Sequence, residues 1–152
     1  MNMKTVQRTV TNIRERVHPH CVVCSPENTH GLRLHFDVIE DGSIKADFNC
    51  DRAYEGYPGV LHGGIIFSII DGAMSNCVFA QGQAAVTVEM TTRFRHPVMI
   101  GRQATVSARI TRNTHSLRLL EAEIVQNGDI KVTAKGKFYD LPEVTEVLRE
   151  GS

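Results

Sequence analysis

Residues 60–82, "VLHGGIIFSIIDGAMSNCVFAQG", hold the side chains best suited to chemistry. The segment opens with His62, Gly63 and Gly64 and then runs apolar, interrupted by one carboxylate, Asp71. A charged group in so apolar a segment is costly unless something uses it. Asp71 is therefore the first candidate for a functional residue.

The start of this segment predicts a site that binds a carbonyl oxygen. Residues 63–80 are expected to form a helix, so Gly63 and Gly64 fall in the first turn, where backbone N–H groups lack intrahelical partners. With the positive end of the helix dipole, such N–H groups polarise a carbonyl and stabilise an oxyanion. His62, just before them, is either part of this site or simply a helix cap or core histidine.

One narrow polar stripe runs along an otherwise apolar helix. Gly64, Ser68, Asp71 and Ser75 follow at spacings of four, three and four residues, which places them on one face. The stripe either meets solvent or lines a binding site. Gly72 is unfavourable within a helix, which suggests a close approach by another backbone.

The spacing along the helix also predicts a dimer. Gly63 and Asp71 are eight residues apart, about 12 Å on an α-helix. One carbonyl cannot contact both groups of the same helix. If both act on one substrate, they come from different chains, and two sites form at a two-fold interface.

The elements around this helix are read from the hydrophobic period. Residues 4–17 predict a short helix, and residues 18–30 are rich in turn formers. Residues 32–50 read as a β-hairpin turning at Asp41-Gly42, and Pro58-Gly59 suits a type II turn in the aperiodic loop 49–61. Gly82 is the expected end of the central helix. Alternating apolar residues predict further strands over 84–95, 103–112, 117–125 and 130–139, with a hairpin turn at Asn127-Gly128, and a charged tail follows Pro142.

This order predicts an α+β fold in which a curved, mostly antiparallel sheet wraps around a long central helix. We expect one domain over residues 1–152, with its core at about 32–140. Because that helix is apolar nearly all round, the side away from the sheet needs another cover, such as a partner subunit.

Composition excludes several classes of protein. Of 152 residues, 41% are hydrophobic and 22% charged, and 17 Lys and Arg balance 17 Asp and Glu. A nucleic-acid-binding protein would need a basic excess, and no apolar run suits a membrane helix or signal peptide. We therefore expect a cytoplasmic protein with no nucleic-acid or membrane partner.

The string "GVLHGGIIFSIIDGAMSNCV" resembles the hotdog-fold acyl-CoA thioesterases, in the branch of the phenylacetate-pathway enzymes. The likeness runs over residues 32–139, and "CVVCSPENTHGLRLHF" is similar to the start of another branch of that superfamily. The resemblance implies a catalytic carboxylate at Asp71, as nucleophile or general base, and a carbonyl-binding N–H at Gly63. It also implies a substrate-orienting His62, and a Thr87 that holds the attacking water or carboxylate.

The chain departs from the family at one position. Several members carry an Asn six residues before the histidine, where this chain has Gly56. Tyr54 or Tyr57 of the same loop is expected near the site instead. Further candidates for substrate binding are Gly64, Ser68, Ser75 and, for the phosphates of coenzyme A, Arg93, Arg95 and His96. The alternative for the two arginines is a solvated strand face.

Cys21 and Cys24 form the one cysteine motif. With His18, His20 and His30 nearby they are a possible zinc site, but a second Cys-x-x-Cys is missing. A redox pair lacks the usual βαβ setting. The favoured interpretation is a turn before the first strand, with no metal and no cofactor.

We therefore expect an acyl-CoA thioesterase that releases free acid and coenzyme A, built as a homodimer or as a homotetramer of two dimers. Aryl, short-chain and medium-chain acyl groups are all compatible with the sequence. One alternative is a non-catalytic acyl-CoA-binding or regulatory protein of the same fold. An acyl hydratase or dehydratase is less favoured, because its histidine and carboxylate pattern fits poorly with an Asp nine residues after His62.

Overall fold

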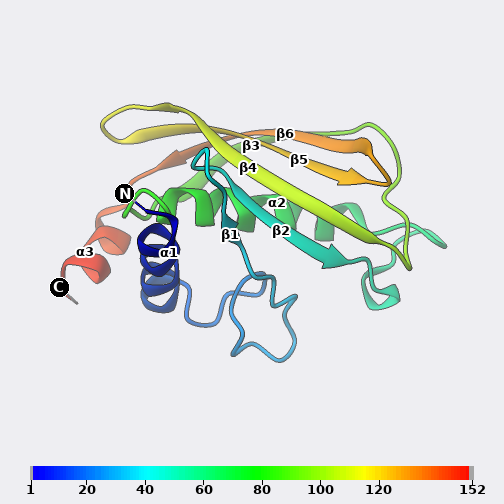
Figure 1. Cartoon of the computed structure of the whole chain (residues 1–152), viewed down its shortest axis with the longest axis horizontal. Coiled ribbons are helices and arrows are strands. Elements are labelled where there is room, and N and C mark those ends of the chain that lie inside the picture. The colour runs from blue at the N-terminus through cyan, green and yellow to red at the C-terminus, as the bar shows by residue number, and fades with distance from the viewer. Residues whose placement is uncertain (1, 151–152) are drawn as a thin grey trace.

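A computed structural model describes residues 2–150, except the side chains of Thr145 and Leu148. Figure 1 shows a curved sheet lying over a long helix, with further helices at one end. The elements are α1 (Met3–Val17), β1 (Asp37–Val38), β2 (Ile44–Asn49), the short 3-10 helix η1 (Arg52–Tyr54), α2 (Gly63–Phe79), β3 (Val86–Phe94), β4 (Gln103–Asn113), β5 (Leu117–Gln126), β6 (Asp129–Tyr139) and α3 (Pro142–Glu150). The predicted curved sheet around a central helix is confirmed.

The six strands form one antiparallel sheet in the order β1-β2-β4-β5-β6-β3. The hairpin β5–β6 turns at Asn127-Gly128, where both residues have positive φ (54° and 80°), as a type I′ turn requires. The chain places β3 beside β6, at the edge, although β4 follows β3 in sequence. This leaves one side of β3 unpaired within the chain.

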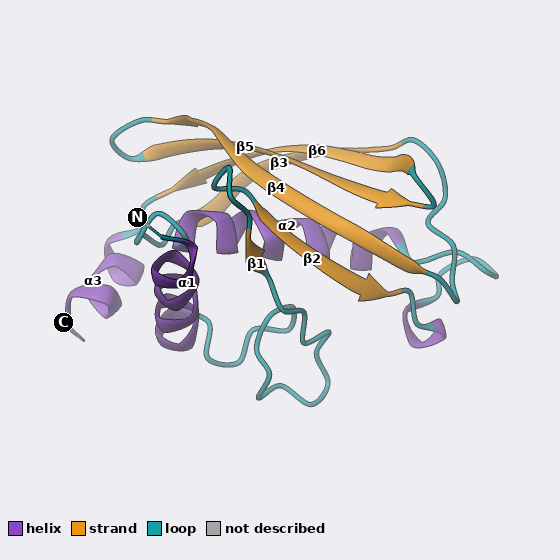
Figure 2. Cartoon of the chain, in the orientation of Figure 1, coloured by secondary structure: helices purple, strands orange, loops and turns teal. Residues whose placement is uncertain are grey.

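Helix α2 fills the concave side of the sheet and packs against β2, β3, β4 and β5 (Figure 2). Ile69, Ile70 and Met74 are at most 1% exposed. On β6, a Cβ added at Gly136 would lie 2.6 Å from the Met74 sulfur, so a larger residue there would displace the Met74 side chain of α2. The predicted end of the helix is also confirmed, since Gly82 has φ +76° and its N–H bonds the Phe79 carbonyl.

The first strand predicted from sequence is largely absent. Only residues 37–38 pair with β2, whereas the segment before them follows the turn around the two cysteines. The N–H groups of Leu32 and Leu34 bond the carbonyls of Val22 and Val23 at 2.7 and 2.8 Å. The alternation of apolar residues predicted a strand, but the segment bonds to a loop instead, and Arg33 within it has a left-handed backbone (φ 51°).

The N-terminal segment closes one end of the core. Val10 and Ile13 of α1 are buried, and α1 contacts α2 and α3. Residues 18–36 then cross below α2, on the side away from the sheet (Figure 1). Among the described helices, none is both long and apolar enough to cross a membrane.

Candidate active site

Asp71 and Thr87 lie in direct contact. Asp71 stands in the middle of α2 and Thr87 near the start of β3, and the Thr87 hydroxyl donates a hydrogen bond to Asp71 Oδ1. Both side chains are half-buried. The edge position of β3 brings them together, because it places this strand alongside α2. A carboxylate held by a hydroxyl, with an open side, is suited to activating water or attacking a carbonyl.

Opposing effects act on the acidity of Asp71. Burial raises the pKa of this carboxyl above its ordinary value, and the nearby Cys21 sulfur acts in the same direction. The hydrogen bond from Thr87 lowers the pKa, as does His18. A carboxylate with a raised pKa is a stronger base, and the Thr87 hydrogen bond favours its ionised form.

The beginning of α2 offers one free backbone donor. His62 caps the helix, and its Nδ1 accepts a hydrogen bond from the Gly64 N–H at 2.9 Å. The Gly64 N–H is therefore occupied, whereas the Gly63 N–H has no acceptor among residues 2–150. Because Nδ1 accepts this bond, a neutral His62 ring carries its proton on Nε2. The carbonyl-binding site predicted from sequence therefore keeps the Gly63 N–H and the helix dipole but loses the Gly64 N–H.

Gly56 lies directly against His62. A Cβ added at Gly56 would approach the His62 Cα to 3.2 Å and its Cδ2 to 3.3 Å, tighter than an ordinary contact. The Tyr54 carbonyl accepts the His62 N–H at 2.9 Å. The absence of the family's Asn therefore goes together with a close packing of this loop on the capping histidine. Tyr57 is 85% exposed at the loop tip, far more than the half-buried Tyr54.

The two serines of the polar stripe bond to the helix itself. The Ser68 hydroxyl donates to the Gly64 carbonyl at 2.9 Å, and the Ser75 hydroxyl donates to the Asp71 carbonyl at 3.0 Å. Ser68 is half-buried, while Ser75 is only 5% exposed. Solvent therefore reaches the stripe at Ser68 and Asp71 but hardly at Ser75. The substrate-binding role assigned to these serines from sequence stays a prediction.

Arg93 and Arg95 lie on the outer face of the sheet, the face away from α2. Between them Phe94 points inward, with its ring 3.6 Å from the Cβ position of Gly63. The two arginines line a surface hollow of about 810 Å³ on the outer face, together with Arg109, Glu121, Glu123 and Lys135. His96 is exposed just after the strand, and its N–H bonds the Lys131 carbonyl. Within one chain the structure does not bring the arginines to Asp71, and their contact with coenzyme A stays a prediction.

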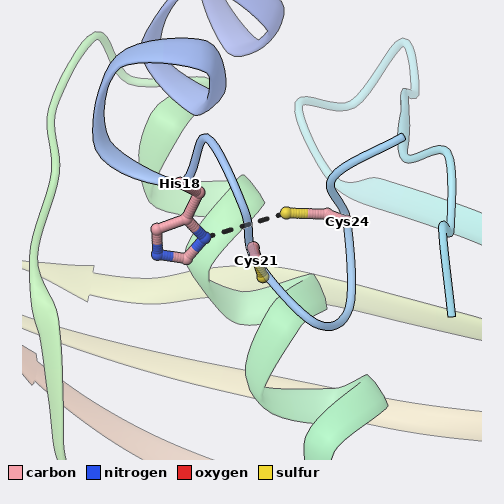
Figure 3. A group of neighbouring side chains, drawn as sticks. All are labelled: His18, Cys21 and Cys24. Atoms are coloured by element: carbon pink, nitrogen blue, oxygen red, sulfur yellow. Dashed lines mark hydrogen bonds between the residues drawn. The ribbon is translucent and has the colours of Figure 1, made fainter. Parts of the chain in front are cut away.

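The Cys-x-x-Cys turn forms a compact cluster with His18 (Figure 3). His18 Nδ1 and the Cys21 and Cys24 sulfurs all lie within 4.8 Å of one another. A hydrogen bond from Cys24 lowers the pKa of the Cys21 thiol to about 3, and the same contact raises the pKa of Cys24. His20 and His30, the other histidines considered from sequence, are exposed and outside this group.

Sequence reasoning missed that this turn sits on α2 beside Asp71. A Cβ added at Gly72 would lie 2.5 Å from Val23 Cγ1, so the expected close approach at Gly72 is made by a side chain instead of a backbone. In the sequence, Gly72 was the one sign that another segment packs closely on this helix. Nothing in the spacing of the chain places residue 18 or 21 near residue 71.

Comparisons with known proteins identify a family and solved structures to which this chain is similar. Residues 58–133, half of the chain, match the family model described as the thioesterase superfamily. No curated protein matches the chain. The roles of Asp71, Gly63, His62 and Thr87 stay predictions from the sequence.

Solved structures share the fold at low identity. The PaaI protein of the Escherichia coli phenylacetic acid degradation operon has a TM-score of 0.75 and 19% identity over 90% of this chain and 96% of its own. A hypothetical thioesterase from Streptococcus pneumoniae TIGR4, solved with coenzyme A, has a TM-score of 0.66 and 17% identity over 78% of this chain and 92% of its own. A thioesterase superfamily protein with a TM-score of 0.74 and 23% identity is longer; 78% of this chain aligns, covering 62% of that protein's length.

Proposed function

The chain has the hotdog fold and belongs to the thioesterase superfamily, and on this basis we propose that it hydrolyses an acyl-CoA thioester to the free acid and coenzyme A. The observation that carries the proposal is the Asp71 carboxylate held by Thr87 on a helix whose first turn presents a free Gly63 N–H. A relative solved with coenzyme A supports the ligand class.

The reaction needs two groups acting on opposite sides of the thioester. The Gly63 N–H and the α2 dipole polarise the carbonyl oxygen and stabilise the negative charge that develops on it. Asp71 removes a proton from a water molecule as the water oxygen bonds to the carbonyl carbon. The C–S bond then breaks, and the coenzyme A thiolate takes up a proton. In the alternative course Asp71 itself attacks the carbonyl carbon, the C–S bond breaks to release the coenzyme A thiolate, and water then hydrolyses the resulting mixed anhydride.

The two groups come from different subunits of a homodimer. Because α2 separates Gly63 from Asp71 by about two turns, each thioester lies between Gly63 of one chain and Asp71 of the other. Apolar side chains are exposed where the partner would sit: Phe67 on α2 is 39% exposed, and Val88 and Phe94 on β3 are each 53% exposed. The unpaired edge of β3 adds backbone donors and acceptors to this surface. A tetramer of two dimers and a cytoplasmic location remain predictions from the sequence.

The test is release of free thiol from a panel of aryl-, short-chain and medium-chain acyl-CoA compounds. Wild-type protein should hydrolyse at least one, and Asp71→Asn should lose most of the turnover, because the amide neither accepts a proton nor attacks. Asp129→Asn at the exposed β5–β6 turn is the matched control and should keep full activity. Hydrolysis by Asp71→Asn at the wild-type rate would refute the mechanism.

Gly56 favours a second candidate, a non-catalytic acyl-CoA-binding protein. This position lacks the side chain that several related enzymes use to orient the carbonyl or the water, and its backbone packs on His62 instead. Calorimetric titration with the acyl-CoA panel separates the two functions. Tight binding of an acyl-CoA that is not hydrolysed over hours would establish the binding protein and exclude the enzyme.

A further inference from the structure

The turn after α1 carries a cluster of metal-ligating atoms that thioester hydrolysis does not use. His18 is the C-cap residue of α1, and Cys21 and Cys24 lie in the turn that follows (Figure 3). From this geometry we propose that His18, Cys21 and Cys24 bind one zinc ion, with a water molecule as the fourth ligand.

The spacing of His18 and Cys24 matches a tetrahedral zinc ion, and the other two ligand spacings are close to it. In a tetrahedral site, zinc–sulfur bonds of about 2.3 Å and zinc–nitrogen bonds of about 2.0 Å place S and N about 3.5 Å apart, and two sulfurs about 3.8 Å apart. The His18 Nδ1 to Cys24 Sγ distance is 3.7 Å, and all three ligand atoms lie within 4.8 Å of one another. Small adjustments of the side chains are sufficient to receive the ion.

The groups around the ligands are arranged to hold them. The Val23 N–H points at the Cys21 sulfur from 3.4 Å, the kind of contact that stabilises a metal-bound thiolate. The His18 ring meets the Phe79 ring edge-on, with centroids 5.1 Å apart and planes at 88°, which fixes its orientation. The Asn76 amide, on α2, interacts with Cys24 and donates to the Gly72 carbonyl at 2.8 Å.

The loop backbone is also preformed. The Ser25 N–H bonds the Cys21 carbonyl at 3.1 Å, and the Ser25 hydroxyl bonds the Pro19 carbonyl at 2.6 Å. Ser25 is fully buried. Further along, the Asn28 side chain donates to the His20 carbonyl at 3.1 Å. These bonds hold the two cysteines in one tight turn without help from a metal, so binding requires little reordering of the chain.

Three soft donors of this kind favour zinc over calcium or magnesium, which prefer oxygen ligands. Across residues 2–150, no fourth His, Cys, Asp or Glu joins the group at this spacing. A water molecule therefore completes the four-coordinate shell. On binding, the thiol protons still held by the cysteines pass to solvent.

A disulfide-forming pair is the rival use of these cysteines. A disulfide would need only the two sulfurs, and both cysteines are free thiols here. A disulfide gives no role to the His18 nitrogen, which lies close to both sulfurs. The imidazole as third donor is the observation that favours metal binding.

The zinc ion would hold the turn in the conformation that packs against α2, beside the catalytic candidate. Val23, between the two cysteines, packs on Gly72, which adjoins Asp71. We therefore expect zinc to raise the thermal stability of the chain, since an ion that binds only the folded state stabilises it.

The experiment measures metal binding directly, independently of thioesterase activity. Reduced protein, freed of metal with a chelator, is titrated with zinc against a chromophoric competitor and, separately, with cobalt. The expected result is one zinc per chain and a thiolate-to-cobalt charge-transfer absorption. The Cys21→Ser/Cys24→Ser double variant should lose both signals, and His18→Ala should weaken zinc binding by about tenfold or more.

His20→Ala is the matched control, since His20 is an exposed histidine of the same loop outside the cluster. It should bind zinc as the wild type does. The proposal is overturned if reduced wild-type protein shows no charge-transfer absorption with cobalt, a measurement that needs no variant to fold. It is also overturned if the double cysteine variant keeps wild-type affinity, or if the cysteines only form a disulfide and bind no zinc.

Discussion

Replacing Thr87 by Val tests the functional use of the contact between β3 and α2. Val keeps the shape and the strand preference of Thr but cannot donate the hydrogen bond that Asp71 receives. Burial already raises the pKa of Asp71, and the Thr87 hydroxyl opposes that effect. Its loss therefore raises the pKa further and makes the ionised, active carboxylate harder to form.

The size of the effect follows from the strength of the bond. A hydrogen bond to a charged group contributes about 1.5–3 kcal/mol, and 1.36 kcal/mol corresponds to a tenfold change in an equilibrium. Because Asp71 is only half-buried, the lower end of this range applies. At acidic pH, where the rate is proportional to the ionised fraction, kcat/KM should fall roughly tenfold. At alkaline pH, where the carboxylate is ionised in both proteins, the two rates should converge.

The assay is the pH dependence of kcat/KM for the best acyl-CoA substrate. The acidic limb of the Thr87→Val profile should move to higher pH. Thr87→Ser, which keeps the hydroxyl, should follow the wild-type profile. Superimposable profiles for wild type and Thr87→Val would refute the argument, because they would show that the rate does not depend on this hydrogen bond or on ionised Asp71.

Three further predictions concern packing, charge and assembly. Gly72→Ala should lower the free energy of unfolding by about 1–2 kcal/mol, since the clash with Val23 exceeds the gain in helix propensity. Urea unfolding should show that the same substitution costs less stability in a Val23→Ala background. An equal loss of stability in that background would show that Val23 does not cause the clash. Asp140→Ala should cost about 1–3 kcal/mol in the same assay, because the 2.5 Å ion pair is lost and Arg118, with a side chain only 2% exposed, keeps its charge. Phe94→Glu puts a charge on the apolar surface proposed as the dimer interface, so light scattering should show monomers and the turnover should be lost. If the variant remains a dimer, the interface lies elsewhere.

Sequence reasoning predicted the elements that depend on local chemistry. The central helix, the hairpin turn at Asn127-Gly128 and the last four strands were found where the apolar period and turn formers indicated them. The strand predicted before Asp41 was wrong over most of its length, because this segment bonds to the cysteine turn and Arg33 has a positive φ, and apolar alternation reveals neither. The candidate site followed from a charge in an apolar helix and glycines at its start.

The sequence by itself determined that Asp71 lies on the largely buried central helix and that the Gly63 N–H opens that helix, since both facts follow from the spacing within one helix. Only the tertiary structure decided what meets them. The order of strands in the sheet puts Thr87 beside Asp71, and the bulge between Thr87 and Glu89 turns Arg93 to the opposite face. The N-terminal turn brings His18 and its two cysteines over α2. These contacts join residues far apart in the chain, and their partners are chosen by packing of the whole molecule, which no local pattern records.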